Sequence, residues 1–268
     1  MVRLAIMALC FACAPAAAAQ TQLSDFAGLW QNFGPRMGPG GPGGPPPGPR
    51  RDAAGPSARL SPDGPAPMPA GRPSGLSDAD AALGLDGGDI RVRELMTPAG
   101  RARFAEFDPA DHPMYNCISP GLPTVMMMPG LQDWSVSGDT LSVRQDVWQE
   151  ARTASLSAVT LADGPHSRQG LSSATLKDGA LIITTTRLSE AWGGLSRNAP
   201  GSAGRTVVET YRLADTDTIR GEIVITDPLY LTQKLSRQVL LRRAPDSLSF
   251  ETFPCERAPY GLLSARQP

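Results

Sequence analysis

The stretch GLSSATLKDGALIITTTR, residues 170–187, decides the fold of this 268-residue chain. Its second half, 180–187, is rich in Ile and Thr, which favour strands, and 170–176 precedes it across the turn Lys177-Asp178-Gly179. Two extended segments joined by a short turn that contains glycine are typical of a β-hairpin. The sequence therefore predicts two antiparallel strands here.

Segments with the same two-residue period lie on both sides of this hairpin. The predicted strands are 133–137, 140–145, 147–156, 170–176, 180–187, 205–213, 218–226 and 231–242. About eight strands at hairpin spacing, with no helical pattern between them, exclude a parallel α/β sheet. The predicted fold class is therefore mostly β, an antiparallel meander that forms a barrel or a strongly curved sheet.

The chain before these strands is organised differently. Residues 20–33 are predicted to form an N-terminal cap or first strand, and residues 34–75 a Gly/Pro-rich disordered linker. Residues 76–130 are predicted as a lead-in of loops with one or two short helices, of which Pro98–Phe107 has Thr as N-cap and Pro at the first helical position. The antiparallel β domain then occupies 131–268.

Residues 1–19 have the features of a secretory signal peptide. Arg3 supplies a positive charge, Leu4–Ala14 an apolar stretch and Ala17–Ala19 a small-residue cleavage site. The apolar stretch is too short to span a bilayer, and no second stretch approaches that length. We therefore expect a periplasmic or secreted protein without an integral membrane segment after the signal is removed.

The predicted export determines how many of the four cysteines remain in the mature protein. Cys10 and Cys13 lie within the predicted signal peptide, which leaves Cys117 and Cys255 in the mature chain. An even pair in an exported protein favours a disulfide. A reactive thiol, the alternative, would need a helix N-terminus or a basic neighbour to lower its pKa, and neither is evident beside these residues. The predicted bond would connect the entrance of the β domain to its exit.

The charge of the chain excludes one class of partner. The formal net charge is −1 and the arginines are spread along the sequence, so no basic surface for nucleic acid is indicated. Glu209 and Glu222 lie in adjacent predicted strands near several arginines. These charges favour a solvated cross-strand ladder over an acid/base pair.

A metal site has one candidate. His112 and Met114 lie near Cys117 and the run Met126–Met128, and sulfur ligands with one imidazole suit Cu(I). Two observations oppose it: consecutive methionines on a strand would point to alternate faces, and methionine is a common filler of cores. Catalytic residues are not indicated, because His112 and His166 are the only histidines and no Gly-x-Ser-x-Gly motif accompanies them. No cofactor is predicted.

Five phrases carry a resemblance to a protein family. They are 95–100, 116–123, 208–212, 225–228 and 255–256. Together they resemble an uncharacterised family of exported, β-rich bacterial proteins. The resemblance implies a secreted β domain and brings no catalytic residues.

A second resemblance is to lipocalins, whose barrel opens with a Gly-x-Trp element similar to Gly28-Leu29-Trp30. It implies that Trp30 closes one barrel end and packs on an arginine of the final strand. Arg237, Arg242 and Arg243 are the candidates, and we predict Arg237, because it shares a face with Leu235, Val239 and Leu241 and a buried arginine needs a barrel end or a partner.

Three functions follow as hypotheses. The first is a non-catalytic binder of a small apolar or amphipathic ligand, because barrels of this strand number can enclose one small molecule. The second is an envelope protein–protein interaction module that uses the 34–75 linker and exposed strand edges. The third is copper handling through His112 and Met114.

Overall fold

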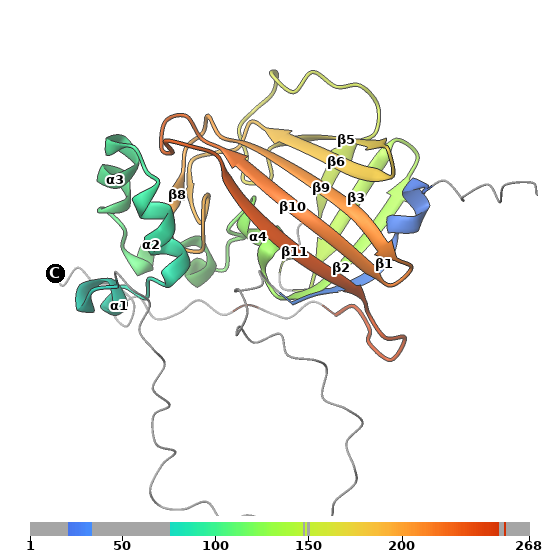
Figure 1. The fold of residues 1–268 in the computed structure, drawn as a ribbon, viewed down its shortest axis with the longest axis horizontal. Coiled ribbons are helices and arrows are strands. Elements are labelled where there is room, and N and C mark those ends of the chain that lie inside the picture. The colour runs from blue at the N-terminus through green and yellow to red at the C-terminus, as the bar shows by residue number, and fades with distance from the viewer. Residues whose placement is uncertain (1–20, 34–75, 147, 149–150, 252–254, 256–268) are drawn as a thin grey trace, which may run out of the picture.

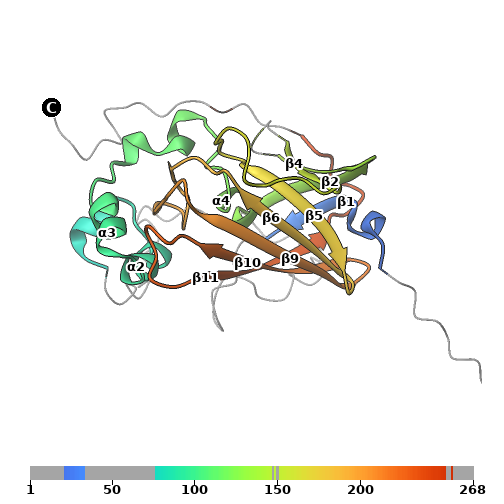
Figure 2. The same cartoon turned by 90° about the horizontal axis from the view of Figure 1, so that it is seen from above.

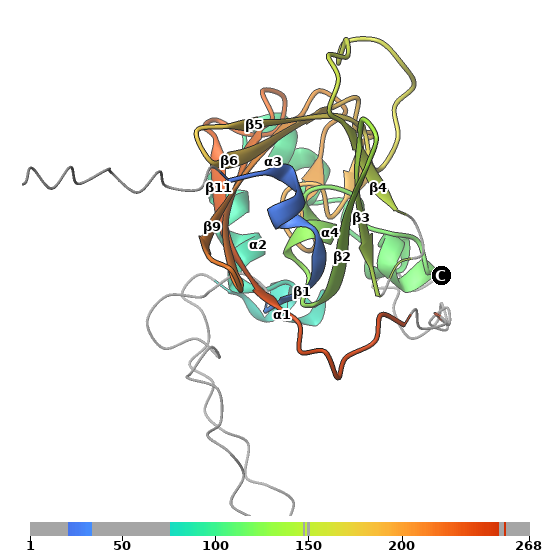
Figure 3. The ribbon, with the colours of Figure 1, turned by 90° about the vertical axis from the view of Figure 1, so that its right-hand side faces the viewer.

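Nine strands close into a barrel. The computed structural model describes residues 21–33, 76–146, 148, 151–251 and 255, and the predicted signal peptide (1–19) and linker (34–75) lie outside the described residues. Around the barrel the strands follow the order β1-β11-β10-β9-β6-β5-β4-β3-β2 (Figure 1, Figure 3). Their bounds are β1 Gly28–Asn32, β2 Gly130–Ser137, β3 Thr140–Gln145, β4 Arg152–Ser155, β5 Leu171–Lys177, β6 Ala180–Thr186, β9 Thr206–Asp215, β10 Thr218–Thr226 and β11 Leu235–Arg243.

The barrel confirms the predicted fold class and corrects it in one place. Neighbouring strands are antiparallel except β4 and β5, which are parallel and meet only at Ser155 and Ser173. The prediction of a purely antiparallel meander is therefore wrong here. Of the predicted strand 147–156, residues 147, 149 and 150 lie outside the described residues, and β4 comprises Arg152–Ser155. It bonds along its length to β3 and only briefly to β5.

Local sequence explains the central hairpin. Asp178 and Gly179 have φ angles of 50° and 69° between β5 and β6, the left-handed conformation that a two-residue type I′ turn requires at both positions. In β10 every second side chain is buried, beginning at Ile219, which is the alternation that the sequence predicted. This period sets the inner face of the barrel.

The 3-10 helix η1 (Leu23–Phe26) covers the barrel end at which β1 begins (Figure 3). Trp30 in β1 is fully buried. The Trp30 indole Nε1 donates to the Phe26 carbonyl at 2.9 Å, and the Arg243 guanidinium lies 4.2 Å from the indole ring centroid, a cation–π contact. Gly28 has a φ of 124°, and a Cβ there would lie 2.6 Å from Arg243 Nη1. Only glycine therefore fits beside this pair.

Helices lie at the opposite end of the barrel (Figure 1, Figure 2). They are α1 (Asp78–Ala82), α2 (Gly87–Glu94) and α3 (Pro98–Phe104). Thr97 caps α3 as predicted, with its side chain accepting from Gly100 N, but the helix ends at Phe104 rather than Phe107. The helix α2, capped by Asp86, was not predicted.

Arg237 does not pack on Trp30, so the predicted pair is corrected to Trp30 and Arg243. Burial and the nearby charge of Arg91 in α2 lower the pKa of Arg237, which places Arg237 near the helical end. Both arginines lie in β11, at positions 237 and 243, and the strand carries them to opposite ends of the barrel. The position along β11 therefore determines which arginine packs on Trp30.

The short helix α4 (Thr124–Met127) is attached to the helical end of the barrel. Asn32 Nδ2, at the end of β1, donates to the Met126 carbonyl at 2.8 Å, and the Gln145 side chain at the end of β3 donates to the Val125 carbonyl. All four residues of α4 are buried. Two of the three consecutive methionines form the end of α4, so the alternation of faces that a strand would impose does not apply to them.

Loops complete this end. They contain η2 (Pro109–Asp111), η3 (Pro113–Asn116) and a two-stranded sheet of β7 (Ala191–Trp192) and β8 (Pro200–Gly201). Cys117, which follows η3, forms a disulfide with Cys255, as predicted, with 5.6 Å between the Cα atoms and a sequence separation of 138. No helix in the described part of the chain is long and apolar enough to cross a membrane.

Candidate binding site inside the barrel

Arg152 occupies the first position of β4 and is 4% exposed, on the inner face. Its Nη2 forms an ion pair with the fully buried Glu209 of β9. The same Nη2 donates to Thr185 Oγ1 of β6 at 3.0 Å, and this hydroxyl also shares a hydrogen bond of 2.7 Å with Ser172 Oγ of β5. Arg152 thus connects β4 to β6 and β9 across the place where β4 and β5 separate.

The second oxygen of Glu209 extends this network. Oε1 accepts a hydrogen bond of 2.7 Å from the Tyr211 hydroxyl, which is fully buried. Burial, and next the charge of Glu209, raise the pKa of Tyr211 well above its ordinary value. The phenol therefore stays protonated and acts as a donor, which excludes it as a general base near neutral pH.

An aromatic contact connects this side-chain network to β2. Trp134 of β2 meets Tyr211 edge to face, with 5.0 Å between ring centroids, and the Trp134 indole donates to Gln132 Oε1 at 3.1 Å. Gln132 is itself 1% exposed. We call Gln132, Arg152, Thr185, Glu209 and Tyr211 the inner polar site.

The inner polar site contains buried polar atoms without a hydrogen-bond partner, of which the acceptor Glu209 Oε2 is engaged in the ion pair with Arg152. Arg152 Nε and Nη1 and Gln132 Nε2 are buried and have no hydrogen-bond partner among the described residues. Folded proteins rarely leave buried donors without a partner, because each such group loses its hydration. In a guanidinium group Nε and Nη1 lie on different edges, so they need two separate acceptor atoms.

Strand register places these donors on one part of the inner face. Trp134 pairs with Val143, and Val143 with Arg152, so Gln132 and Arg152 are only two strands apart. The inner residues that follow on β4 and β5, Ala154 and Ala174, are small and buried. Short side chains therefore form the inner wall that follows Arg152 on β4 and β5.

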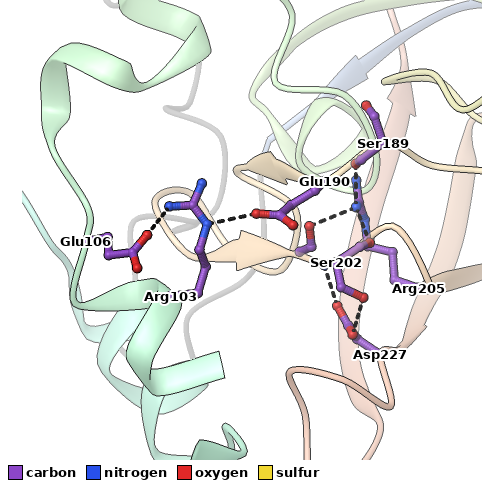
Figure 4. Close-up of polar contacts among 8 residues, drawn as sticks. Arg103, Glu106, Ser189, Glu190, Ser202, Arg205 and Asp227 are labelled. Carbon is purple, nitrogen blue, oxygen red and sulfur yellow. Dashed lines mark hydrogen bonds and ion pairs between the residues drawn. The ribbon is translucent and has the colours of Figure 1, made fainter. Parts of the chain in front are cut away.

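A second buried arginine belongs to the helical end of the barrel (Figure 4). Arg205 is 1% exposed. Its Nη1 and Nη2 donate to four backbone carbonyls, those of Ser189 at 2.8 Å, Gly201 at 3.1 Å, Ser202 at 2.7 Å and Leu122 at 3.1 Å. Burial lowers the pKa of Arg205 to about 10. This side chain holds three loop segments together.

Carboxylates at this end are bound by neighbours of Arg205 (Figure 4). Asp227 accepts from Ser202 N at 2.7 Å, Ser202 Oγ at 2.6 Å and Tyr230 N at 3.1 Å. Glu190 accepts from Arg103 Nε of α3 at 2.8 Å. Each of these contacts orders a loop or anchors a helix, so this cluster is structural.

His112 and Met114, the predicted metal candidates, also belong to the helical end. His112 is 1% exposed. Its Nε2 donates to the Arg197 carbonyl at 2.7 Å, and its Nδ1 accepts from Met114 N at 3.2 Å. Burial lowers the pKa of this imidazole. Both nitrogens are therefore occupied, and the described residues contain no group of three or more His, Cys, Asp or Glu side chains suited to hold a metal ion.

The expected ladder of Glu209 and Glu222 does not form. Glu222 is exposed and accepts from Ser236 Oγ at 2.7 Å, whereas Glu209 points into the barrel. Sequence reasoning missed Glu209 and Arg152, although a signal was present. Glu209 alternates with Val207 and Tyr211, which are apolar or aromatic, so the two-residue period already assigns it to the inner face.

Comparisons with known proteins add no family to these observations. No protein-family model, curated protein or solved structure matches this chain. The resemblances to an exported β-rich family and to lipocalins therefore stay predictions. The candidate site depends on its own geometry alone.

Proposed function

We propose that the barrel binds a small neutral molecule in its interior, through hydrogen-bond acceptors that meet Arg152 and Gln132. The observation that carries the proposal is the set of three buried donors without partners, Arg152 Nε, Arg152 Nη1 and Gln132 Nε2. A ligand with one or two acceptor oxygens would supply what the inner wall lacks. Trp134 and Tyr211 offer apolar ring surface to the rest of such a molecule.

The charges of the site favour a neutral ligand over an anion. Arg152 already forms an ion pair with Glu209, so the two charges cancel. A bound carboxylate would add a buried negative charge without a counter-charge, which is costly in an apolar interior. A ketone, ester or amide oxygen would accept from Arg152 without this cost.

This proposal narrows the predicted binder of an apolar or amphipathic ligand to one with an acceptor group. Copper handling receives less support, because a metal at His112 would have to break the hydrogen bonds to Arg197 O and Met114 N. The interaction module depends on the 34–75 linker, which lies outside the described residues.

Acetophenone and benzoate form a suitable pair of probes, because they have nearly the same shape and differ in charge. We expect acetophenone to quench the tryptophan fluorescence of the purified protein in a saturable way and benzoate to have little effect. Isothermal titration calorimetry would give the stoichiometry. Equal binding of both probes, or of neither, would contradict the proposal.

The matched variants separate the inner site from the surface. The double variant Arg152→Met/Glu209→Gln removes the donors without leaving a buried charge, and we expect it to lose acetophenone binding. Arg144→Met is the control, because Arg144 lies on the neighbouring strand β3 and pairs with Asp133 at the surface. Circular dichroism would verify that both variants are folded. Retained binding by the double variant would place the ligand elsewhere.

A further inference from the structure

A solvent-open pocket lies on the outside of the barrel, at the end of β6 and the start of β9. Its volume is about 410 Å³. The loop between β4 and β5 forms one wall. Apart from two threonines and Gly204, the lining consists of three apolar and three basic residues, which are Leu161, Ala162, Ala203, His166, Arg187 and Arg205. No carboxylate lines it.

We infer that this outer pocket binds a small carboxylate that carries a short apolar group. Arg187 provides the first contact. Its Nε donates to the Gly164 carbonyl at 2.7 Å and its Nη2 donates to the same oxygen. This leaves Nη1 without a partner among the described residues. The guanidinium is thus held in place by the loop, and its third nitrogen remains for a ligand.

His166 provides the second contact. A carbonyl oxygen can only accept, so the hydrogen bond of 2.8 Å between Nδ1 and the Leu188 carbonyl requires a proton on Nδ1. Nε2 is then left for a ligand. The same hydrogen bond fixes the ring orientation beside Arg187.

Arg205 provides the third basic group. It is 1% exposed, and its Nε is buried without a partner among the described residues. The acidic residues that influence its charge, Asp227 and Glu190, accept hydrogen bonds from Ser202 and Arg103 instead. Asp227 and Glu190 therefore offset part of the charge of Arg205, and the positive character of the pocket, which favours an anion, comes mainly from Arg187, because no carboxylate is among the lining residues.

The site is independent of the inner polar site and has the opposite charge preference. Butyrate and butyramide test it, because they share a three-carbon chain and differ in charge. We expect ¹H–¹⁵N NMR titration of the full chain to show saturable shifts at residues 161–166 and 187 with butyrate, and none there with butyramide. Equal shifts with both probes would overturn the inference.

Two variants locate the binding. Arg187→Gln and His166→Gln should each weaken butyrate binding, the first by about tenfold, the change expected for one charge-assisted hydrogen bond. The control is Arg212→Gln, because Arg212 is an exposed arginine on β9 that likewise donates to a turn carbonyl, Asp178 O at 2.7 Å. Unchanged affinity in both test variants, or an equal loss in the control, would overturn the inference. Butyrate binding that depends on Arg152 and Glu209 would also overturn it.

Discussion

Two buried arginines, Arg152 and Arg205, solve the same physical problem in different ways. Both are at most 4% exposed. Arg205 donates to four backbone carbonyls from three segments, whereas the bonds of Arg152 go to the side chains of Glu209 and Thr185. An arginine bonded to the backbone holds the chain in place. An arginine bonded only to side chains can exchange these partners for a ligand while the backbone hydrogen bonds between the strands stay in place.

The charge balance of the two arginines differs as well. Glu209 cancels the charge of Arg152 directly, and the Tyr211 hydroxyl satisfies the second carboxylate oxygen. Arg205 has carbonyl dipoles in place of a carboxylate, and burial lowers its pKa to about 10. The comparison indicates that the two Nη atoms of Arg205 serve the fold, whereas Nε and Nη1 of Arg152 are available for a ligand.

The largest expected effect tests the structural half of this comparison. Arg205→Met removes the side-chain donor of four carbonyls, of which that of Ser202 keeps a backbone hydrogen bond, from Arg205 N at 3.4 Å. Each unsatisfied buried group costs about 1–3 kcal/mol. We expect the free energy of unfolding to fall by about 4 kcal/mol, measured by urea denaturation. Arg212→Met, which replaces an exposed arginine on the strand that follows Arg205, β9, should change it by less than about 0.5 kcal/mol. A loss of similar size in both variants would break the comparison.

A smaller and recoverable effect is expected inside the barrel. Arg152→Met alone leaves Glu209 as a buried charge without a partner, so we expect a loss of about 3 kcal/mol. Adding Glu209→Gln removes that charge and should bring the free energy of unfolding back to within about 1 kcal/mol of wild type. A double-mutant cycle measures the coupling. If the double variant is as unstable as the single one, Arg152 holds the fold as Arg205 does.

The smallest expected effect concerns His112, which bonds to the backbone as Arg205 does. Burial lowers the pKa of His112 below its ordinary value of 6.5. The unfolded chain therefore binds the proton first, so stability is full above that value and declines as the pH falls through it, by at most about 1.4 kcal/mol per pH unit. Urea denaturation at about pH 7.5 and 5.5 measures this loss. His112→Asn should remove much of the dependence, and an unchanged slope would assign it to another group.

Much of the fold could be predicted from local pattern. The hairpin of β5 and β6 follows from Asp178-Gly179 between segments of regular period, and the helix start at Thr97-Pro98 follows from capping chemistry. The helix α4 was not predicted, because the methionine run in it is apolar throughout and has no period. This helix depends on contacts from Asn32 and Gln145, which are distant in sequence.

The candidate site was only partly accessible to sequence reasoning. Period alone assigns Glu209 to the inner face, but it does not show that Arg152, 57 positions earlier, reaches the same place. The arginine that packs on Trp30 was predicted as Arg237 and is Arg243. Both errors concern distance along and across strands, which depends on register.

The sequence by itself determined the strands, the turns and the pairing of Cys117 with Cys255, because these depend on local propensity and on a small number of cysteines. Only the tertiary structure decided that β4 and β5 run parallel, that α4 joins the barrel end and that Arg152 meets Glu209. The physical reason is that closure brings together side chains from strands far apart in the chain. Closure of the barrel determines which buried charges form ion pairs, and the local sequence pattern does not predict these pairs.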